Sequence, residues 1–158
     1  ELTIVYDGDD AGDGQFTDPD YGLRSPDNLE WANDGYVYIQ EDRSTSSSID
    51  PGFCDDSEEE ASIWKLDPDN GDLTRIVQVN RNAALPGGQT DNDPTDCGDW
   101  ETSGIEDISH LFDTDDDETL LMFNVQAHSV RDGSIEEHDL AQGGQILFLG
   151  KDLDVDDD

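Results

Sequence analysis

Alternating polar and apolar side chains mark a pair of strands in the first third of the chain. Successive side chains of residues 36–40 fall on opposite faces, as the period of two in a β-strand requires. Residues 33–35, Asn-Asp-Gly, come just before this run and tolerate positive φ. The pattern therefore predicts a hairpin in which residues 29–31 pair with residues 36–40.

Short apolar runs separated by turn residues continue to the end of the chain. Further strands are expected at residues 2–6, 63–66, 73–79, 120–125 and 145–149. The run 120–125 is the most apolar and should be a central strand, whereas residues 108–112 favour a strand end or a short helix. Pro68 and Gly71 preset the backbone of the turn between the second pair of strands, so we interpret that Asp-rich segment as a turn.

Short strands in sequential pairs, without a long helix, predict an all-β meander. A blade of a β-propeller has four antiparallel strands in roughly 40 residues, so the 158 residues correspond to two or three blades. We expect one propeller segment over residues 1–158, with acidic loops at 43–60 and 81–99 and an acidic tail at 152–158. The remaining blades would come from another chain or another copy, and a closed sandwich is the alternative.

The charge is extreme, with 42 acidic residues against seven Lys and Arg and a net charge of −35. Such a charge repels nucleic acid and anionic membrane surfaces, and no apolar run is long enough for a membrane span. Three interpretations remain, which are calcium binding, a salt-rich habitat, or surface solubility alone. Disorder would also suit this composition, but the Trp, Tyr and Phe residues and the strand patterns indicate a folded chain.

The two cysteines, Cys54 and Cys97, both stand in polar, Asp-rich loops. A disulfide between them is the plain interpretation and implies a secreted or periplasmic protein, while metal ligation by a thiolate is the alternative. The chain begins at Glu1 in an expected strand, which suggests a processed or excised piece.

Oxygen ligands stand at both outer ends of the first predicted hairpin. Asp27 and Asn28 precede its first strand, and Glu41 and Asp42 follow its second. Antiparallel strands bring these ends together, and Ca²⁺ takes about six to eight oxygen ligands. The sequence therefore predicts a cation site here. The loop at residues 7–14 is similar to an EF-hand, but it lacks the required spacing and flanking helices.

Five motifs occur in a characteristic order. They are Ser-Pro-Asp-Asn-Leu at 25–29, Ile-Gln-Glu-Asp at 39–42, Trp-Glu-Thr-Ser-Gly-Ile at 100–105, Asn-Val-Gln-Ala-His at 124–128 and Gly-Gly-Gln-Ile-Leu at 143–147. This succession resembles the C-terminal part of the PhoX-type alkaline phosphatases, secreted bacterial enzymes. The similarity covers about residues 20 to 150.

The resemblance implies a β-propeller whose axial pocket holds calcium and iron and hydrolyses phosphate monoesters. Carried over by position, Asp27, Asn28 and Glu101 are the best candidates for axial metal ligands, followed by Glu41 and Asp42. The family's enzymes are longer, and their N-terminal blades supply further ligands, including a cysteine bound to iron. We therefore expect calcium here, and iron only when those blades or another subunit are present.

Two residues are weaker catalytic candidates. His128 could orient a ligand or the phosphate, although a histidine after an apolar strand is more often structural. Arg24 could neutralise a phosphate, although a lone arginine more often pairs with a carboxylate. The resulting hypothesis is metal-dependent hydrolysis of phosphate monoesters by an incomplete PhoX-like enzyme. The alternative is a non-catalytic calcium-binding or structural interaction module built from the same blades.

Overall fold

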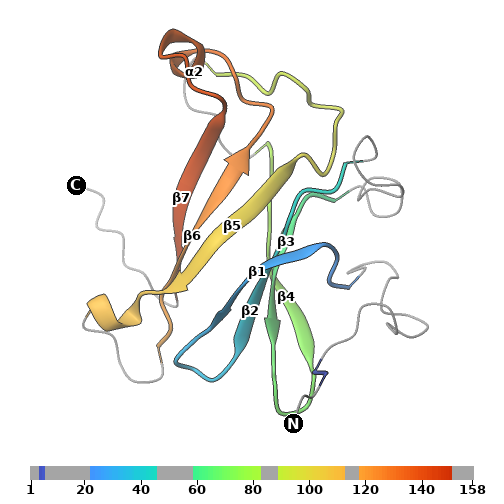
Figure 1. The fold of residues 1–158 in the computed structure, drawn as a ribbon, viewed down its shortest axis with the longest axis vertical. Helices are drawn as coiled ribbons and strands as arrows, with labels where there is room; N and C mark the ends of the chain where they lie inside the picture. The colour runs from blue at the N-terminus through green and yellow to red at the C-terminus, as the bar shows by residue number, and fades with distance from the viewer. Residues whose placement is uncertain (1–3, 6–21, 46–58, 83–88, 113–117, 151–158) are drawn as a thin grey trace.

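The computed structural model describes residues 4–5, 22–45, 59–82, 89–112 and 118–150. Within these ranges the protein forms two antiparallel sheets with almost no helix (Figure 1). In chain order the elements are β1 (Pro26–Trp31), β2 (Val37–Glu41), β3 (Ser62–Leu66), β4 (Leu73–Gln78), β5 (Trp100–Asp107), η1 (Ser109–Leu111), β6 (Leu121–Ala127), α2 (Ser134–Glu137) and β7 (Gly143–Leu149). The predicted all-β character is confirmed.

Both sheets follow the chain order. The first, here called sheet A, has the order β1-β2-β3-β4, and the second, sheet B, has the order β5-β6-β7. The first predicted hairpin is confirmed, since Trp31 pairs with Val37 and the N–H of Ala32 donates to the carbonyl of Tyr36 at 3.0 Å. Gly35 has a φ of +85°, which explains why the turn needs a residue without a side chain.

The second hairpin is also confirmed, with β3 paired to β4. Its turn closes through a hydrogen bond from the N–H of Asp67 to the carbonyl of Asp72, and the side chain of Asn70 accepts from the Asp72 N–H. These carboxylate and amide groups support the turn itself. Strand β6 is central in sheet B, as expected, and residues 109–111 form a 3₁₀ helix rather than a strand end.

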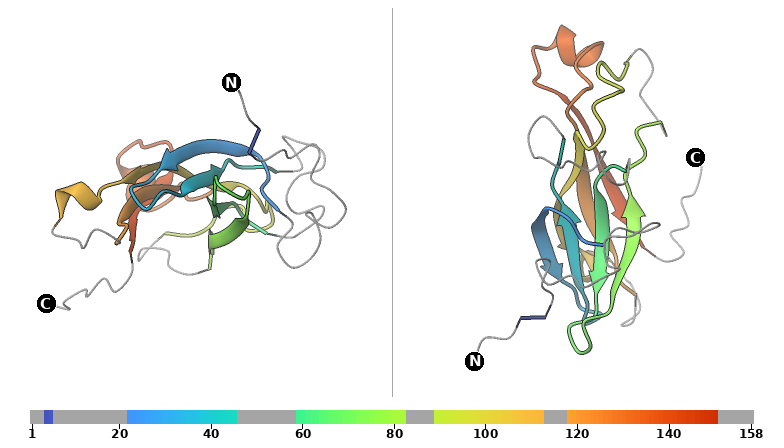
Figure 2. Two further views of the ribbon diagram at one scale, coloured as in Figure 1. Left: turned by 90° about the horizontal axis from the view of Figure 1, so that it is seen from below. Right: turned by 90° about the vertical axis from the view of Figure 1, so that its right-hand side faces the viewer.

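The main core lies between the two sheets. Strand β5 of sheet B contacts β1, β2 and β3 of sheet A. Figure 2 shows the ribbon from two further directions. The buried residues of this cluster are Ala32, Tyr38, Ile63, Val79, Trp100, Ile105, Leu121, Phe123, Val125, Ala127 and Val130. Ile63 and Leu121 are almost completely buried, and each such side chain stabilises the fold by about 1.5–3 kcal/mol.

The outer faces of both sheets carry exposed apolar side chains. Leu29 and Trp31 on β1 are each 66% exposed, and Ile146 on β7 is 73% exposed. A second, smaller cluster of Leu23, Ile39, Trp64 and Leu66 lies on the outer face of sheet A. The sheets do not close on themselves within the described ranges, because sheet A ends at β1 and β4 and sheet B at β5 and β7.

Several expectations concern residues outside the described ranges. These are the loop at 7–14, most of the loop at 43–60, the tail at 152–158 and Cys54. Of the strand expected at residues 2–6, only Ile4 and Val5 are described, and neither is in a strand. No helix in the described part of the chain is long and apolar enough to span a membrane.

Candidate functional site

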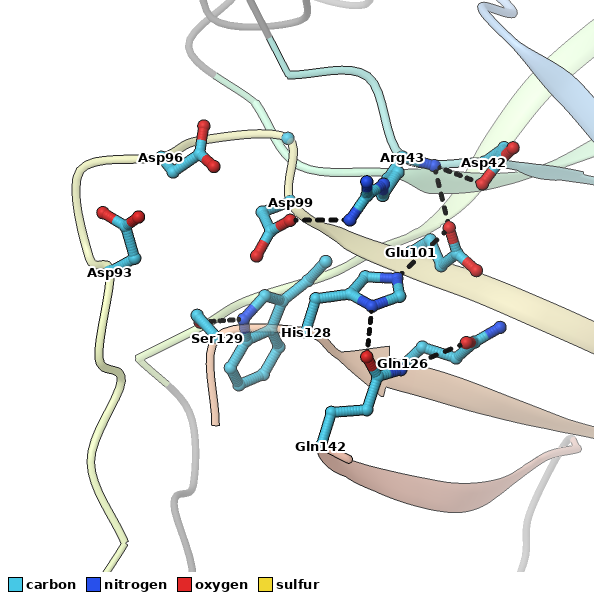
Figure 3. Close-up of polar contacts among 12 residues, drawn as sticks. Asp42, Arg43, Asp93, Asp96, Asp99, Glu101, Gln126, His128, Ser129 and Gln142 are labelled. Carbon is cyan, nitrogen blue, oxygen red and sulfur yellow. Dashed lines mark hydrogen bonds and ion pairs between the residues drawn. The ribbon is translucent and has the colours of Figure 1, made fainter. Parts of the chain in front are cut away.

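Two carboxylates from different sheets meet beside the backbone of Arg43 (Figure 3). Asp42 directly follows β2, and Glu101 is the second residue of β5. The N–H of Arg43 donates to Oδ1 of Asp42 at 2.7 Å and to Oε2 of Glu101 at 3.2 Å. Trp100 and Thr102 are buried, so the alternation of a strand turns Glu101 to the other face of β5.

The two carboxyl groups influence each other's ionisation. A hydrogen bond to Glu101, together with burial, raises the pKa of Asp42 to about 6. Burial opposes ionisation of Glu101, but hydrogen bonds with His128, Asp42 and the Arg43 backbone outweigh it and lower its pKa to about 2. While Asp42 keeps its proton, only Glu101 is negatively charged, and when that proton leaves, two negative charges face each other.

Asn28 ties the start of β1 to β5. Its Oδ1 accepts from the N–H of Gly104 at 2.9 Å and from the hydroxyl of Ser103 at 3.4 Å, while its Nδ2 donates to Asp27. Asp27 is exposed, and its negative charge contributes to the raised pKa of Asp42. Both predicted residues therefore lie on the same side of the molecule as the Asp42–Glu101 pair, with Asn28 in a cross-linking position.

Glu41 has a different environment from Asp42. It is fully buried, and it accepts from the N–H of Arg24 at 2.7 Å and from the N–H of Ser62 at 2.9 Å. The guanidinium of Arg24 lies 3.5 Å from Glu41 and 3.6 Å from Glu59. Glu41 and Arg24 thus stabilise sheet A as partners of each other.

His128 lies on the other side of Glu101. Its Nε2 is 3.5 Å from Oε2 of Glu101, and its Nδ1 is 2.7 Å from Oε1 of Gln142. Nε2 of Gln142 in turn donates to Oε1 of Gln126 at 3.4 Å. The hydrogen bond with Glu101 raises the pKa of His128 despite its burial, which favours the charged imidazolium next to the carboxylate.

Sequence reasoning missed three residues of this region, which are Arg43, Asp99 and Gln142. The guanidinium of Arg43 is 3.3 Å from Asp99, a buried residue just before β5, and this ion pair joins the two sheets beside the site. Arg43 directly follows Glu41 and Asp42, the two predicted ligands at the end of a strand, and this position was the sequence signal that could have identified it. Gln142 had only its place before the Gly-Gly motif as a signal.

The carboxylates beside the Arg43 N–H supply only some of the ligands that a metal ion needs. The carboxylates of Asp42, Glu101 and the nearby Asp27 suit a hard cation such as Ca²⁺. In the described ranges, however, no three His, Cys, Asp or Glu side chains are arranged to hold a metal. The residues thus fit one part of a shell of about six to eight oxygens, and water or other segments would have to supply the rest.

Cys97 lies in the segment before β5 and is disulfide-bonded. The chain contains only two cysteines, so a bond within the chain requires Cys54. Because Cys54 lies outside the described residues, the pairing itself stays a prediction.

The chain has no match among known protein families, curated proteins or solved structures. The likeness to the PhoX-type phosphatases therefore rests on the five sequence motifs, and function has to be argued from the arrangement of the residues.

Proposed function

We propose that this chain forms one side of a divalent-cation site in a phosphatase similar to the PhoX-type enzymes, and that the complete site hydrolyses phosphate monoesters. The observation that carries the proposal is the Asp42–Glu101 pair, in which two sheets bring two carboxylates to one point. Such a pair is stable with a shared proton, and a bound cation removes the same repulsion when the proton is absent.

The arrangement of the sheets supports this proposal. Each sheet is a meander of successive strands, as a propeller blade is, and the first strands of the two sheets, β1 and β5, are in contact. These two strands carry Asn28 and Glu101. If sheets A and B are adjacent blades, their first strands would line a common axis, and the candidate ligands would face it.

The charge of the chain gives the cation a definite role. A phosphate dianion is repelled by a surface of Asp and Glu side chains, so it requires a metal to offset that repulsion. Bound metal would stabilise negative charge on the transferred phosphoryl group. The protein's own contribution is to hold Asp42 and Glu101 at the junction of the sheets, where the Arg43 N–H orients both carboxylates.

Hydrolysis of p-nitrophenyl phosphate with and without Ca²⁺ tests the function, both with the chain alone and with a PhoX-type N-terminal segment added. We expect Ca²⁺-dependent hydrolysis that Glu101→Gln abolishes. Glu106→Gln is the matched control, because Glu106 is an exposed residue of the same strand. Absence of hydrolysis in both formats would refute the enzymatic proposal.

A non-catalytic calcium-binding or interaction module is the second candidate. The observation that favours it is the exposure of Leu29, Trp31, Ile146 and Phe148 on the outer faces of the two sheets. Apolar faces of this kind suit contact with further sheets or subunits. Ca²⁺ binding that depends on Glu101 in a chain without hydrolytic activity would favour this candidate over the enzyme.

A further inference from the structure

Two side-chain hydrogen bonds and one ion pair link sheet B to Glu101. Gln126 on β6 accepts from Gln142, Gln142 contacts Nδ1 of His128, and Nε2 of His128 faces Oε2 of Glu101, as Figure 3 shows. Glu101 had a functional expectation from the sequence, and His128 and Gln126, which stand in the motif at residues 124–128, had a weaker one. Gln142 enters through the structure, because it lies 14 positions after His128 in the sequence.

The chemistry of these groups defines which atom carries which proton. Oε1 of Gln142 is an amide oxygen and can only accept, so Nδ1 of His128 must carry the hydrogen between them. The other ring nitrogen, Nε2, is thereby directed at Glu101. The ring cannot rotate without losing its 2.7 Å contact with Gln142, so this hydrogen bond fixes the orientation of the ring. In the imidazolium both ring nitrogens carry hydrogen, so Nδ1 faces the Gln142 oxygen while Nε2 faces Glu101.

Gln142 itself is held by its neighbours in the chain. The next residue, Gly143, donates its N–H to the carbonyl of Val130 at 2.8 Å and pairs with Ala127 at the start of β7. A Cβ at Gly143 would lie 3.0 Å from the Val130 side chain, so the close approach favours glycine. The backbone beside Gln142 is thus anchored to the end of β6, which is the element that leads into His128.

The contacts on Glu101 converge on one of its oxygens. Both the Arg43 N–H, at 3.2 Å, and Nε2 of His128, at 3.5 Å, are closest to Oε2. The side chains of His128 and Glu101 are only 13% and 11% exposed, so water screens this ion pair little. A carboxylate held on one oxygen from two sides has a defined plane, and its second oxygen, Oε1, receives neither of these two donors.

We propose that His128 and Gln142 are positioning residues of the cation site, which hold the Glu101 carboxylate in the orientation that binds a divalent cation. The inference rests on the function proposed above. Hydrogen-bond partners of metal-ligating carboxylates typically change metal affinity by about 10–100-fold. In this arrangement Gln142 acts through His128, and neither residue touches the substrate.

Calorimetry with Ca²⁺ at one fixed pH tests the inference on the full chain. Gln142→Leu removes the acceptor for Nδ1 at similar size, and His128→Ala removes the ring. We expect each to weaken Ca²⁺ binding by about 10-fold or more, and Gln142→Glu, which retains an acceptor oxygen, to bind within about 3-fold of wild type. Gln78→Leu and His138→Ala are the matched controls, because both residues are exposed and neither is among the partners of Glu101 given above.

Two further readouts separate positioning from general stability. The long-range ¹H–¹⁵N spectrum of the His128 ring should show hydrogen on both ring nitrogens in wild type and a shifted Nδ1 resonance in Gln142→Leu, which lacks the acceptor for that hydrogen. Gln142→Leu should still unfold in one cooperative transition without Ca²⁺, so that a loss of affinity is not a loss of fold. If His128→Ala does not fold, Gln142→Leu decides the question.

The outcomes distinguish this inference from the proposed function. Weaker binding in Glu101→Gln but wild-type binding in both Gln142→Leu and His128→Ala would overturn the positioning role and leave the cation site intact. Wild-type binding in Glu101→Gln, or no Ca²⁺ binding by the wild-type chain, would overturn the proposed site and this inference with it.

Discussion

Among the described Lys and Arg residues, Arg81 has the least exposed side chain, and its removal gives a clear prediction. Its guanidinium donates to both oxygens of Asp91 at 2.9 and 3.0 Å, to Glu60 at 3.1 Å and to the hydroxyl of Ser129 at 3.2 Å. The side chain is 8% exposed and lies over the ring of Trp100 at 5.6 Å. It therefore joins the end of sheet A, the segment before β5 and the end of β6.

The expected loss in the free energy of unfolding follows from the contacts that Glu60 keeps when Arg81 is replaced by Met. Glu60 is 10% exposed, burial raises its pKa, and it would keep only the N–H groups of Gly98 and Trp100 as donors. Removing one partner of a buried ion pair costs about 3–5 kcal/mol. Because small domains are stable by only about 5–15 kcal/mol, Arg81→Met should remove a large share of the free energy of unfolding.

Urea unfolding at constant salt, followed by tryptophan fluorescence, measures this loss. Arg81→Lys keeps the positive charge but cannot reach all of these acceptors, so we expect an intermediate loss of about 1–3 kcal/mol. Arg131→Met is the control, since Arg131 is exposed and should cost less than about 0.5 kcal/mol. A loss below about 1 kcal/mol in Arg81→Met would refute the argument that burial makes this ion pair indispensable.

Three more predictions concern the junction of the sheets and the cation. Gly104→Ala should destabilise the chain by about 1–2 kcal/mol in urea unfolding, because Gly104 has a φ of +62° and a Cβ would lie 2.9 Å from Nδ2 of Asn124. Burial would raise the pKa of Asp107, but hydrogen bonds from Asn33 and Ser109 outweigh it and lower that pKa. Its stabilisation is therefore present above the unfolded-state pKa of about 3.9 and is lost as pH falls through the lower folded-state value, so Asp107→Asn should flatten acid unfolding below about pH 4. A chelator should lower the melting temperature of a Ca²⁺-loaded sample, since Ca²⁺ at about 100 times its Kd adds about 2.7 kcal/mol, and an identical melting curve with the chelator would count against the cation site.

Local structure was predictable where neighbouring residues determine it. The turn at residues 33–35 follows from Asn-Asp-Gly, and Asp34 supports it by accepting from the Tyr36 N–H at 3.1 Å. The Asp-rich turn before β4 was likewise predictable from Pro68 and Gly71. The alternation of side chains along a strand also bears on the predicted metal ligands, although the prediction did not take it into account. Glu41 and Asp42 are adjacent, so in an extended chain their side chains point to opposite faces and cannot share one site.

The candidate site depended on contacts that no local pattern encodes. Arg43 and Glu101 are separated by 58 residues, and Asn28 and Gly104 by 76, so their approach results from the packing of one sheet on the other. The five motifs identified Asn28 and Glu101 as candidates but gave no relative placement. Gln142 was not predictable, because it contacts the His128 ring only when the connection between β6 and β7 folds back onto the end of β6.

The distribution of the few basic residues explains why the Asp42–Glu101 pair stands apart from the other acidic residues. With seven Lys and Arg for 42 acidic residues, most carboxylates have no cationic partner in the chain, and burial is tolerated where one is supplied. Buried or partly buried carboxylates paired in this way are Glu41 with Arg24, Asp34 with Lys65, Glu59 with Arg75, Glu60 and Asp91 with Arg81, and Asp99 with Arg43. Among the described residues, Asp42 and Glu101 have no recorded Lys or Arg side-chain partner, and their neighbours are a backbone N–H and His128. Asp107 is also buried without a Lys or Arg partner among the described residues, but the N–H groups of Asn33 and Ser109 donate to it. The lack of a Lys or Arg side chain at the Asp42–Glu101 pair therefore supports the proposal that a divalent cation binds there.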